Sequence, residues 1–183
     1  MKYAITGGIG SGKSHICRLL QKHGIDIYDC DAAAKRIVAT SEKVRRQLQE
    51  CVGMEVFHTD GSLNKPMLAE FLLKSDENTA IVNHIVHPAV AEDFVQSGKQ
   101  WMECAILFSS GFNRLVDRVV CVTAPLEVRL DRIVKRDGIT REKAREWIDK
   151  QWPQQKVAEL SDFVIVNDGT ADLESQIGAI INE

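Results

Sequence analysis

The feature that most constrains this chain is a glycine-rich run near its N-terminus, Gly7-Gly8-Ile9-Gly10-Ser11-Gly12-Lys13-Ser14. It fits the pattern G-x-x-x-x-G-K-[ST], in which glycines let backbone N–H groups surround a phosphate. The lysine neutralises β- and γ-phosphate oxygens, and the serine hydroxyl can bind Mg²⁺. Residues 2–6 favour a strand before the run, and residues 14–23 carry apolar positions at helical spacing after it. The pattern therefore predicts a strand, a loop and a helix that bind a nucleoside triphosphate.

Strand and helix patterns alternate through the rest of the chain. Further strands are predicted at 25–29, 101–108, 118–122 and 163–166. Helical segments are predicted from 32 to about 97, with a helix start or break at His87-Pro88, and then at 125–137, 141–160 and 172–181. This order predicts an α/β fold in three layers, a five-stranded parallel sheet between helices. Ligands of such sheets bind at the carboxyl ends of the strands, where the glycine-rich run lies.

Composition narrows the class of protein. A chain of 183 residues is long enough for one compact domain, and its net charge of −3 gives no sign of a nucleic-acid partner. The five cysteines are odd in number and never spaced as C-x-x-C, which is typical of reduced thiols in a cytoplasmic protein. No apolar run reaches the roughly 18 residues expected of a membrane span, so we expect no membrane partner.

Two acids follow the second predicted strand. In extended backbone Asp29 and Asp31 would point to the same side, near the γ-phosphate. One carboxylate could take a proton from a hydroxyl group, and either could hold Mg²⁺ through water. The alternative for Asp31 is a structural one, the N-cap of a helix that begins at Ala32.

Arginines gather on a later predicted helix. Arg129, Arg132 and Arg136 fall at i, i+3 and i+7, and Arg141 follows beyond Gly138. Such a stripe is often only a solvated face. In a phosphate-loop protein it also suits a mobile lid that stabilises the migrating phosphoryl group and excludes water.

Other classes of phosphate-loop protein fit less well. GTPases read guanine with Asn-Lys-x-Asp, and the nearest string here, Asn64-Lys65-Pro66-Met67, lacks the acid. A hydrolase would usually end an apolar strand in an acid, whereas the strand predicted to end at Phe108 runs into Ser109-Ser110-Gly111. The residues favour a small-molecule kinase over a nucleotide-dependent switch.

Several strings together resemble the dephospho-CoA kinase family, over essentially the whole chain. They are the glycine-rich run, Asp29-Cys30-Asp31, His87-Pro88 with Val90, Ile106-Leu107-Phe108, Arg132 with Arg136-Asp137, Gln151, and the closing segment from Asp162 to Gly169. The resemblance implies transfer of the ATP γ-phosphate to the ribose 3′-hydroxyl of dephospho-CoA, the last step of coenzyme A synthesis. It also implies a phosphate-loop kinase core of about residues 1–32, 99–125 and 161–183. A helical acceptor-binding insertion would span about 33–98, and a helical lid about 126–160.

Motif and resemblance together assign roles to individual residues. Asp31 is expected to be the catalytic base, with Lys13 and Arg136 as the other catalytic residues. ATP and dephospho-CoA are the expected partners, with Mg²⁺ as cofactor held by Ser14 and Asp31. The acceptor is expected to contact Asp29, His87 and Pro88. The residues expected to bind ATP are Gly8, Gly10, Ser11, Gly12, Lys13, Ser14, His15, Arg132 and Asn167.

The chain departs from the family pattern at three positions. Ser109 stands where the family usually has an acid after Pro-Leu-Leu-Phe, Arg129 stands where it commonly has Gln, and His15 replaces the usual Thr. The loop, Asp31 and the lid arginines are retained, so an active enzyme is expected. Another nucleotide or small-metabolite kinase of the same fold remains the nearest alternative.

Overall fold

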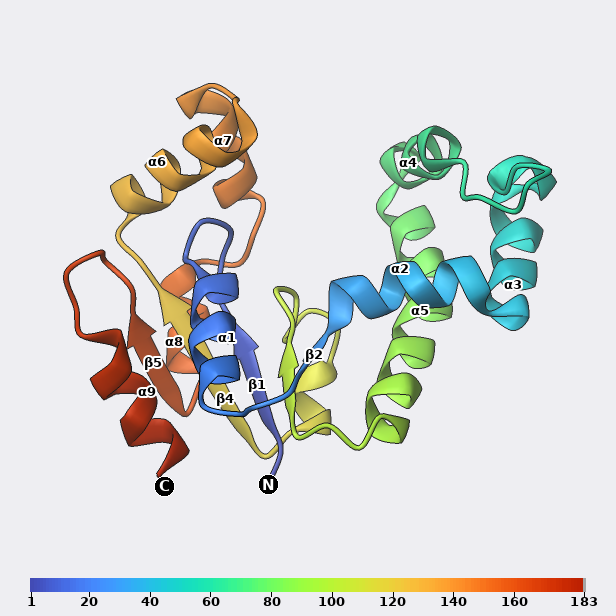
Figure 1. Ribbon diagram of the computed structural model, residues 1–183. Helices are drawn as coiled ribbons and strands as arrows, with labels where there is room; N and C mark the ends of the chain where they lie inside the picture. Colours follow the sequence, from blue (N-terminus) through green and yellow to red (C-terminus); the bar gives the residue numbers. More distant parts are fainter. Residues whose placement is uncertain (183) are drawn as a thin grey trace. The chain divides into compact units, whose positions relative to one another are not determined.

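The computed structural model describes residues 1–182, and these form two compact units. Met1–Tyr28 and the chain from Lys99 onward make the first unit, and Asp29–Gly98 makes the second. The first unit carries most of the sheet, and the second consists mainly of helices (Figure 1).

The sheet has the predicted five strands. They are β1 (Tyr3–Thr6), β2 (Ile27–Asp29), β3 (Trp101–Glu103), β4 (Arg118–Thr123) and β5 (Phe163–Val166), in the order β2-β3-β1-β4-β5. β1 pairs in parallel with β3 and β4, and β4 pairs in parallel with β5. Tyr3 lies opposite Trp101, and their rings stack at 4.3 Å between centroids. The observed sheet confirms the predicted α/β class.

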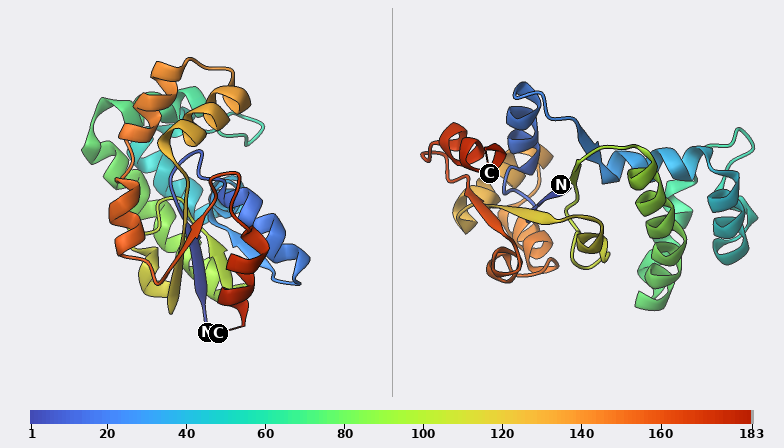
Figure 2. Two further views of the ribbon diagram at one scale, coloured as in Figure 1. Left: turned by 90° about the vertical axis from the view of Figure 1, so that its left-hand side faces the viewer. Right: turned by 90° about the horizontal axis from the view of Figure 1, so that it is seen from below.

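Helices cover both faces of this sheet. On one face α1 (Lys13–Lys22) and α9 (Leu173–Ile181) bury apolar side chains in a core shared with all five strands. On the opposite face α8 (Gln154–Glu159) packs against β4 (Figure 2). Two further helices of the first unit, α6 (Leu126–Asp137) and α7 (Arg141–Asp149), pack on each other through Leu130, Ile133 and Ala144. The three layers predicted from the sequence are therefore present.

The third predicted strand is shorter than expected, because it ends at Glu103 and not at Phe108. The Cys104 N–H still donates to the Ile5 carbonyl at 3.0 Å, after which the chain turns. The hydroxyls of Ser109 and Ser110 donate to carbonyls three residues back, both at 3.2 Å. Serines that bond to nearby backbone carbonyls in this way compete with a strand ladder.

Proline explains two other differences from the predicted helices. The segment predicted as one helix at 141–160 is two helices, and Pro153 stands between them directly before α8. The predicted start or break at His87-Pro88 is wrong, because α5 (Asp76–Gln96) continues through Pro88. Pro88 has no N–H, so the His84 carbonyl cannot receive the usual helical bond from it.

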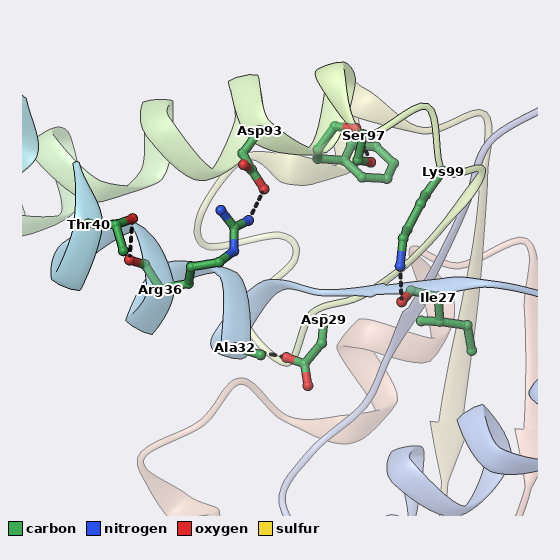
Figure 3. Close-up of polar contacts among 9 residues, drawn as sticks. Ile27, Asp29, Ala32, Arg36, Thr40, Asp93, Ser97 and Lys99 are labelled. Atoms are coloured by element: carbon green, nitrogen blue, oxygen red, sulfur yellow. Dashed lines mark hydrogen bonds and ion pairs between the residues drawn. The ribbon is translucent and has the colours of Figure 1, made fainter.

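The second unit is built around α5. The helices α2 (Cys30–Thr40), α3 (Glu42–Val52) and α4 (Lys65–Lys74) each pack against α5. A 3₁₀ turn (Met54–Val56) lies between α3 and α4 in the chain. Arg36 on α2 pairs with Asp93 on α5 at 2.5 Å, as Figure 3 shows. Val82, Val90 and Phe94 form the buried side of α5.

The N-cap of α2 is Asp29. Its Oδ1 accepts the Ala32 N–H at 2.9 Å (Figure 3), whereas Asp31 lies exposed in the first turn of the helix. The expectation that both acids extend from one strand is wrong, because the strand ends at Asp29 and the helix begins at Cys30. The capping role considered for Asp31 therefore belongs to Asp29.

Replacing Asp29 by Ala should lower the free energy of unfolding by about 1 kcal/mol, the usual cost of a lost N-cap, while Asn should largely keep it. Urea denaturation measures both. Asp31→Ala is the matched control, with a change within about 0.5 kcal/mol as for other exposed positions. A larger loss for Asp31→Ala than for Asp29→Ala would contradict the capping assignment.

Candidate active site

The glycine-rich run forms a loop between β1 and α1, as predicted. α1 begins at Lys13, and Gly12 precedes it with φ of 94°, in the left-handed region. A Cβ atom at Gly12 would lie 2.1 Å from Nδ2 of Asn167. Only glycine fits here, because any side chain would meet both a strained backbone and a buried amide.

Lys13 lies against the first residue of the loop. Its Nζ donates to the Gly7 carbonyl at 2.8 Å and lies 3.9 Å from Oε1 of Glu103. Both side chains are mostly shielded, with 13% and 16% of their surface exposed. Glu103 is the last residue of β3, so an apolar strand does end in an acid beside the loop. A strand that ran to Phe108, as predicted from the sequence, would not have ended at this acid.

The loop is held by its backbone carbonyls. Arg129 Nε donates to the Ile9 carbonyl at 2.9 Å, and Arg132 Nη1 donates to the Gly10 and Ser11 carbonyls at 3.3 and 3.1 Å. Asn167 Nδ2 also donates to the Ser11 carbonyl, at 2.9 Å. Three consecutive carbonyls are therefore bound by side chains from α6 and from the end of β5.

This anchoring sets the direction of the N–H groups. In a planar trans peptide the C=O and the next N–H point in opposite directions. Binding the Ile9 and Ser11 carbonyls to side chains therefore turns the Gly10 and Gly12 N–H groups to the other side of the chain. The Ser11 N–H is held within the loop by the Gly8 carbonyl at 3.1 Å. A curved row of such N–H groups, next to the start of a helix, is a site for a phosphate.

Two predicted ATP-binding residues are part of this anchoring. Arg132 Nη2 donates to Oδ1 of Asn167 at 3.2 Å, so their side chains brace each other. Asn167 is only 5% exposed, and its own N–H donates to the Thr123 carbonyl at 2.8 Å. The Ser11 side chain is fully buried, whereas Ser14 and His15 are exposed at the start of α1.

The arginines that were predicted to form one stripe lie in different environments. Arg129 is 5% exposed, and burial lowers the pKa of its guanidinium. Arg136 is exposed and paired with Asp137 through Nη2 at 2.7 Å, which raises the pKa of Arg136. Arg141 forms ion pairs with Glu127 and Asp131, and so connects α7 to α6.

Burial also raises the pKa of Cys121, on β4, to about 11, so this thiol stays protonated at neutral pH.

The remaining predicted site residues belong to the second unit. Pro88 lines a cavity of about 500 Å³ among α2, α3 and α5. His87 is half-buried, and burial, with a smaller contribution from the charge of His84, lowers its pKa. Asp29 and Asp31 lie at the start of α2. In residues 1–182 no group of three or more His, Cys, Asp or Glu side chains is arranged to hold a metal ion.

A second cavity, of about 240 Å³, lies in the first unit. It is lined by Thr6 at the end of β1, by residues 105–109 and by the segment that follows α7. In that segment Trp152 stacks on Phe108 at 6.3 Å between ring centroids. Ser109, which departs from the family pattern, also lines this cavity.

Fold and loop together define a phosphate-loop kinase fold. The shikimate kinase structure from Aquifex aeolicus has this fold, with a TM-score of 0.55 and 16% identity over the whole of this chain and 95% of that one. The crystal structure of TT1252 from Thermus thermophilus is more similar, with a TM-score of 0.84 and 28% identity over 100% of this chain and 96% of that one.

Comparison of sequences identifies the family. The family model described as dephospho-CoA kinase matches residues 1–172. A dephospho-CoA kinase of Bacteroides fragilis is 42% identical over 99% of this chain and 91% of its own length. One of Chlorobaculum tepidum is 37% identical over 94% and 89%. The chain belongs to the dephospho-CoA kinase family, as its motifs predicted.

Replacing Asn167 by Leu should raise the dissociation constant for MgADP at least tenfold. The Ser11 carbonyl and the Arg132 guanidinium each lose one of their hydrogen bonds, which should also cost about 1–3 kcal/mol of stability. Calorimetric titration and urea denaturation measure the two effects. Asn182→Leu, at the exposed end of α9, is the control and should leave MgADP binding unchanged. Unaltered binding in Asn167→Leu would refute the anchoring role.

Proposed function

We propose that this protein transfers the γ-phosphoryl group of ATP to the ribose 3′-hydroxyl of dephospho-CoA and releases coenzyme A and ADP. The observation that carries this proposal is the family match over residues 1–172, in a chain whose phosphate loop is complete and anchored. Membership of the family supports dephospho-CoA as the acceptor, and the phosphate loop supports ATP as the phosphate donor.

Lys13 and the loop N–H groups are the proposed phosphate-binding groups. Phosphoryl transfer places charge on oxygens of the migrating group, and an enzyme accelerates it chiefly by positioning and by electrostatic stabilisation. The Lys13 ammonium, anchored on Gly7 beside the loop, is suited to contact the β- and γ-phosphates. Arg136, exposed at the end of α6, is the proposed arginine for the migrating group, and its guanidinium pairs with the neighbouring Asp137.

Asp31 is the proposed base. Because Asp29 makes the cap bond of α2, the exposed Asp31 carboxylate is not used for that purpose. In a loose phosphoryl-transfer transition state the base mainly orients the hydroxyl and accepts its proton late. Asp29, His87 and Pro88 are proposed to contribute to acceptor binding, with Asp29 acting chiefly through the position of α2.

The residues present suit Mg²⁺ delivered with ATP. This ion is usually bound by one or two carboxylates, phosphate oxygens and water, so it needs no cluster of protein ligands. The exposed Ser14 hydroxyl and the Glu103 carboxylate offer such oxygens in the first unit, and Asp31 offers one in the second. When bound, Mg²⁺ neutralises charge on the phosphate oxygens. Glu103 joins the proposed metal residues because it closes β3 beside Lys13.

An acceptor panel tests the proposed function. ATP and Mg²⁺ are offered with dephospho-CoA, with AMP, with shikimate or with water alone, and ADP release is measured. Dephospho-CoA should give turnover at least about 100-fold above water, because only a bound acceptor should complete the site. Faster turnover with AMP would assign a nucleotide kinase, and equal ADP release in all four samples would assign a nucleotide hydrolase or switch.

Asp31→Asn should fold like the parent and lose about 10²–10⁴ in turnover with dephospho-CoA, the usual contribution of a general base. The amide keeps the size of the side chain but cannot take the proton. Asp29→Asn is the matched control and should lose less, because Asn caps a helix nearly as well as Asp. A folded Asp31→Asn protein with most of its activity would refute the base assignment.

Glu103→Gln should raise the Mg²⁺ concentration needed for half-maximal turnover about fivefold or more, since a carboxylate is a far better ligand oxygen for Mg²⁺ than an amide. Initial rates at fixed ATP across a Mg²⁺ series measure this. Glu174→Gln, which removes an exposed partner of His23, is the control and should leave the Mg²⁺ dependence unchanged. An unchanged Mg²⁺ dependence in Glu103→Gln would leave Glu103 only as the ionic partner of Lys13.

A further inference from the structure

Ile9, in the middle of the phosphate loop, is held at three points by residues 126–151, which comprise α6, α7 and the two residues after α7 and are called here the α6–α7 segment. Its carbonyl accepts from Arg129 Nε at 2.9 Å, and its N–H donates to Oε1 of Gln151 at 2.7 Å. Its side chain packs against the apolar cluster of Leu130, Ile133 and Ala144 between α6 and α7. The residues that hold Ile9 are far from it in sequence, by 120 and 142 positions for the two hydrogen bonds.

The two hydrogen bonds fix two successive peptide planes. The Ile9 carbonyl shares its peptide with the Gly10 N–H, and the Ile9 N–H shares its peptide with the Gly8 carbonyl. Because each peptide is planar, Arg129 sets the direction of the Gly10 N–H, and Gln151 sets the direction of the Gly8 carbonyl. That Gly8 carbonyl in turn accepts the Ser11 N–H at 3.1 Å. The two side chains therefore define the shape of the first half of the loop.

Arg129 fits closely in this place. A Cβ atom on Gly8 would lie 2.4 Å from Arg129 Nη2, and one on Gly10 would lie 2.7 Å from the Arg129 carbonyl. With 5% of its surface exposed, Arg129 is not a member of a solvated face. A glutamine side chain also carries N–H donors, so Arg129→Gln would retain a donor for the Ile9 carbonyl.

We propose that Arg129 and Gln151 form a clamp on the Ile9 peptides, called here the Ile9 clamp, through which the α6–α7 segment sets the phosphate loop in its nucleotide-binding shape. Both are positioning residues, since they act on the nucleotide through the backbone of Ile9. The proposal rests on the proposed function only in taking the loop as the ATP site. It predicts that the position of the α6–α7 segment and the affinity for nucleotide are coupled through Ile9.

Four variants distinguish the effect of losing the hydrogen bonds to Ile9 from the effect of altered side-chain packing. Gln151→Leu and Arg129→Leu remove the acceptor and the donor, whereas Gln151→Glu and Arg129→Gln keep them. Arg145→Leu is the control, because Arg145 lies exposed on α7 and pairs with Asp149. Binding of MgADP is measured by calorimetry, and amide hydrogen exchange of residues 7–13 is measured without nucleotide.

The Leu variants should weaken MgADP binding by about 5- to 10-fold, the effect expected of one lost hydrogen bond that preorganises a site. The Ile9 N–H should exchange faster in Gln151→Leu, and the Glu and Gln variants should stay within about twofold of the parent in binding. If Arg129→Leu does not fold, Gln151→Leu alone tests the proposal. Parent-like binding by Gln151→Leu, or Glu and Gln variants as impaired as the Leu variants, would overturn the proposal.

Because MgADP binding needs no acceptor, the result is independent of turnover. Failure of the unaltered protein to phosphorylate dephospho-CoA would defeat the proposed function and leave this measurement intact. A kinetic comparison adds a second distinction. In Gln151→Leu the KM for ATP should rise by the same factor as the dissociation constant, while the KM for dephospho-CoA stays within about twofold, since the clamp acts on uniform nucleotide binding. A rise confined to the KM for dephospho-CoA would contradict the clamp.

Discussion

The interaction on which the rest of the site depends is the binding of three consecutive phosphate-loop carbonyls by Arg129, Arg132 and Asn167. A loop that binds phosphate must turn its N–H groups toward the anion, which leaves its carbonyls in need of donors elsewhere. Here the donors are two guanidinium groups and a buried amide. They satisfy the carbonyls, place positive charge behind the loop, and link the loop to α6 and to the end of β5.

The arginines of α6 differ in what they contact along the helix. Arg129 and Arg132 donate hydrogen bonds to the loop carbonyls, whereas Arg136 lies exposed and pairs with Asp137. Helical periodicity places all three on one side of α6, but only the first two lie over the loop. The exposed Arg136 is therefore the arginine that we propose for the substrate, while the buried Arg129 and the half-buried Arg132 hold the loop.

Local patterns in the sequence predicted the loop, the five parallel strands and the family, because a phosphate loop and an apolar strand are encoded by neighbouring residues. They did not predict Glu103 as a strand end, because the apolar run continues to Phe108 although the strand ends at Glu103 and the chain then turns. Nor did they predict the Ile9 contacts, which join residues 120 and 142 positions apart. The role of Asp29 as a cap was assigned to Asp31 because the helix starts two residues earlier than its apolar pattern indicated.

Amide hydrogen exchange at single-residue resolution, with and without MgADP, tests the account of the loop most directly. The Ile9 and Ser11 N–H groups are bonded within the protein, so they should exchange slowly before nucleotide is added. The Gly10 and Gly12 N–H groups should exchange fast in the free protein and slow at least about tenfold when MgADP binds, as expected of donors held ready for phosphate oxygens. Slow exchange at Gly10 and Gly12 without nucleotide, or no change on binding, would contradict the claim that the anchored carbonyls aim these groups at the phosphate.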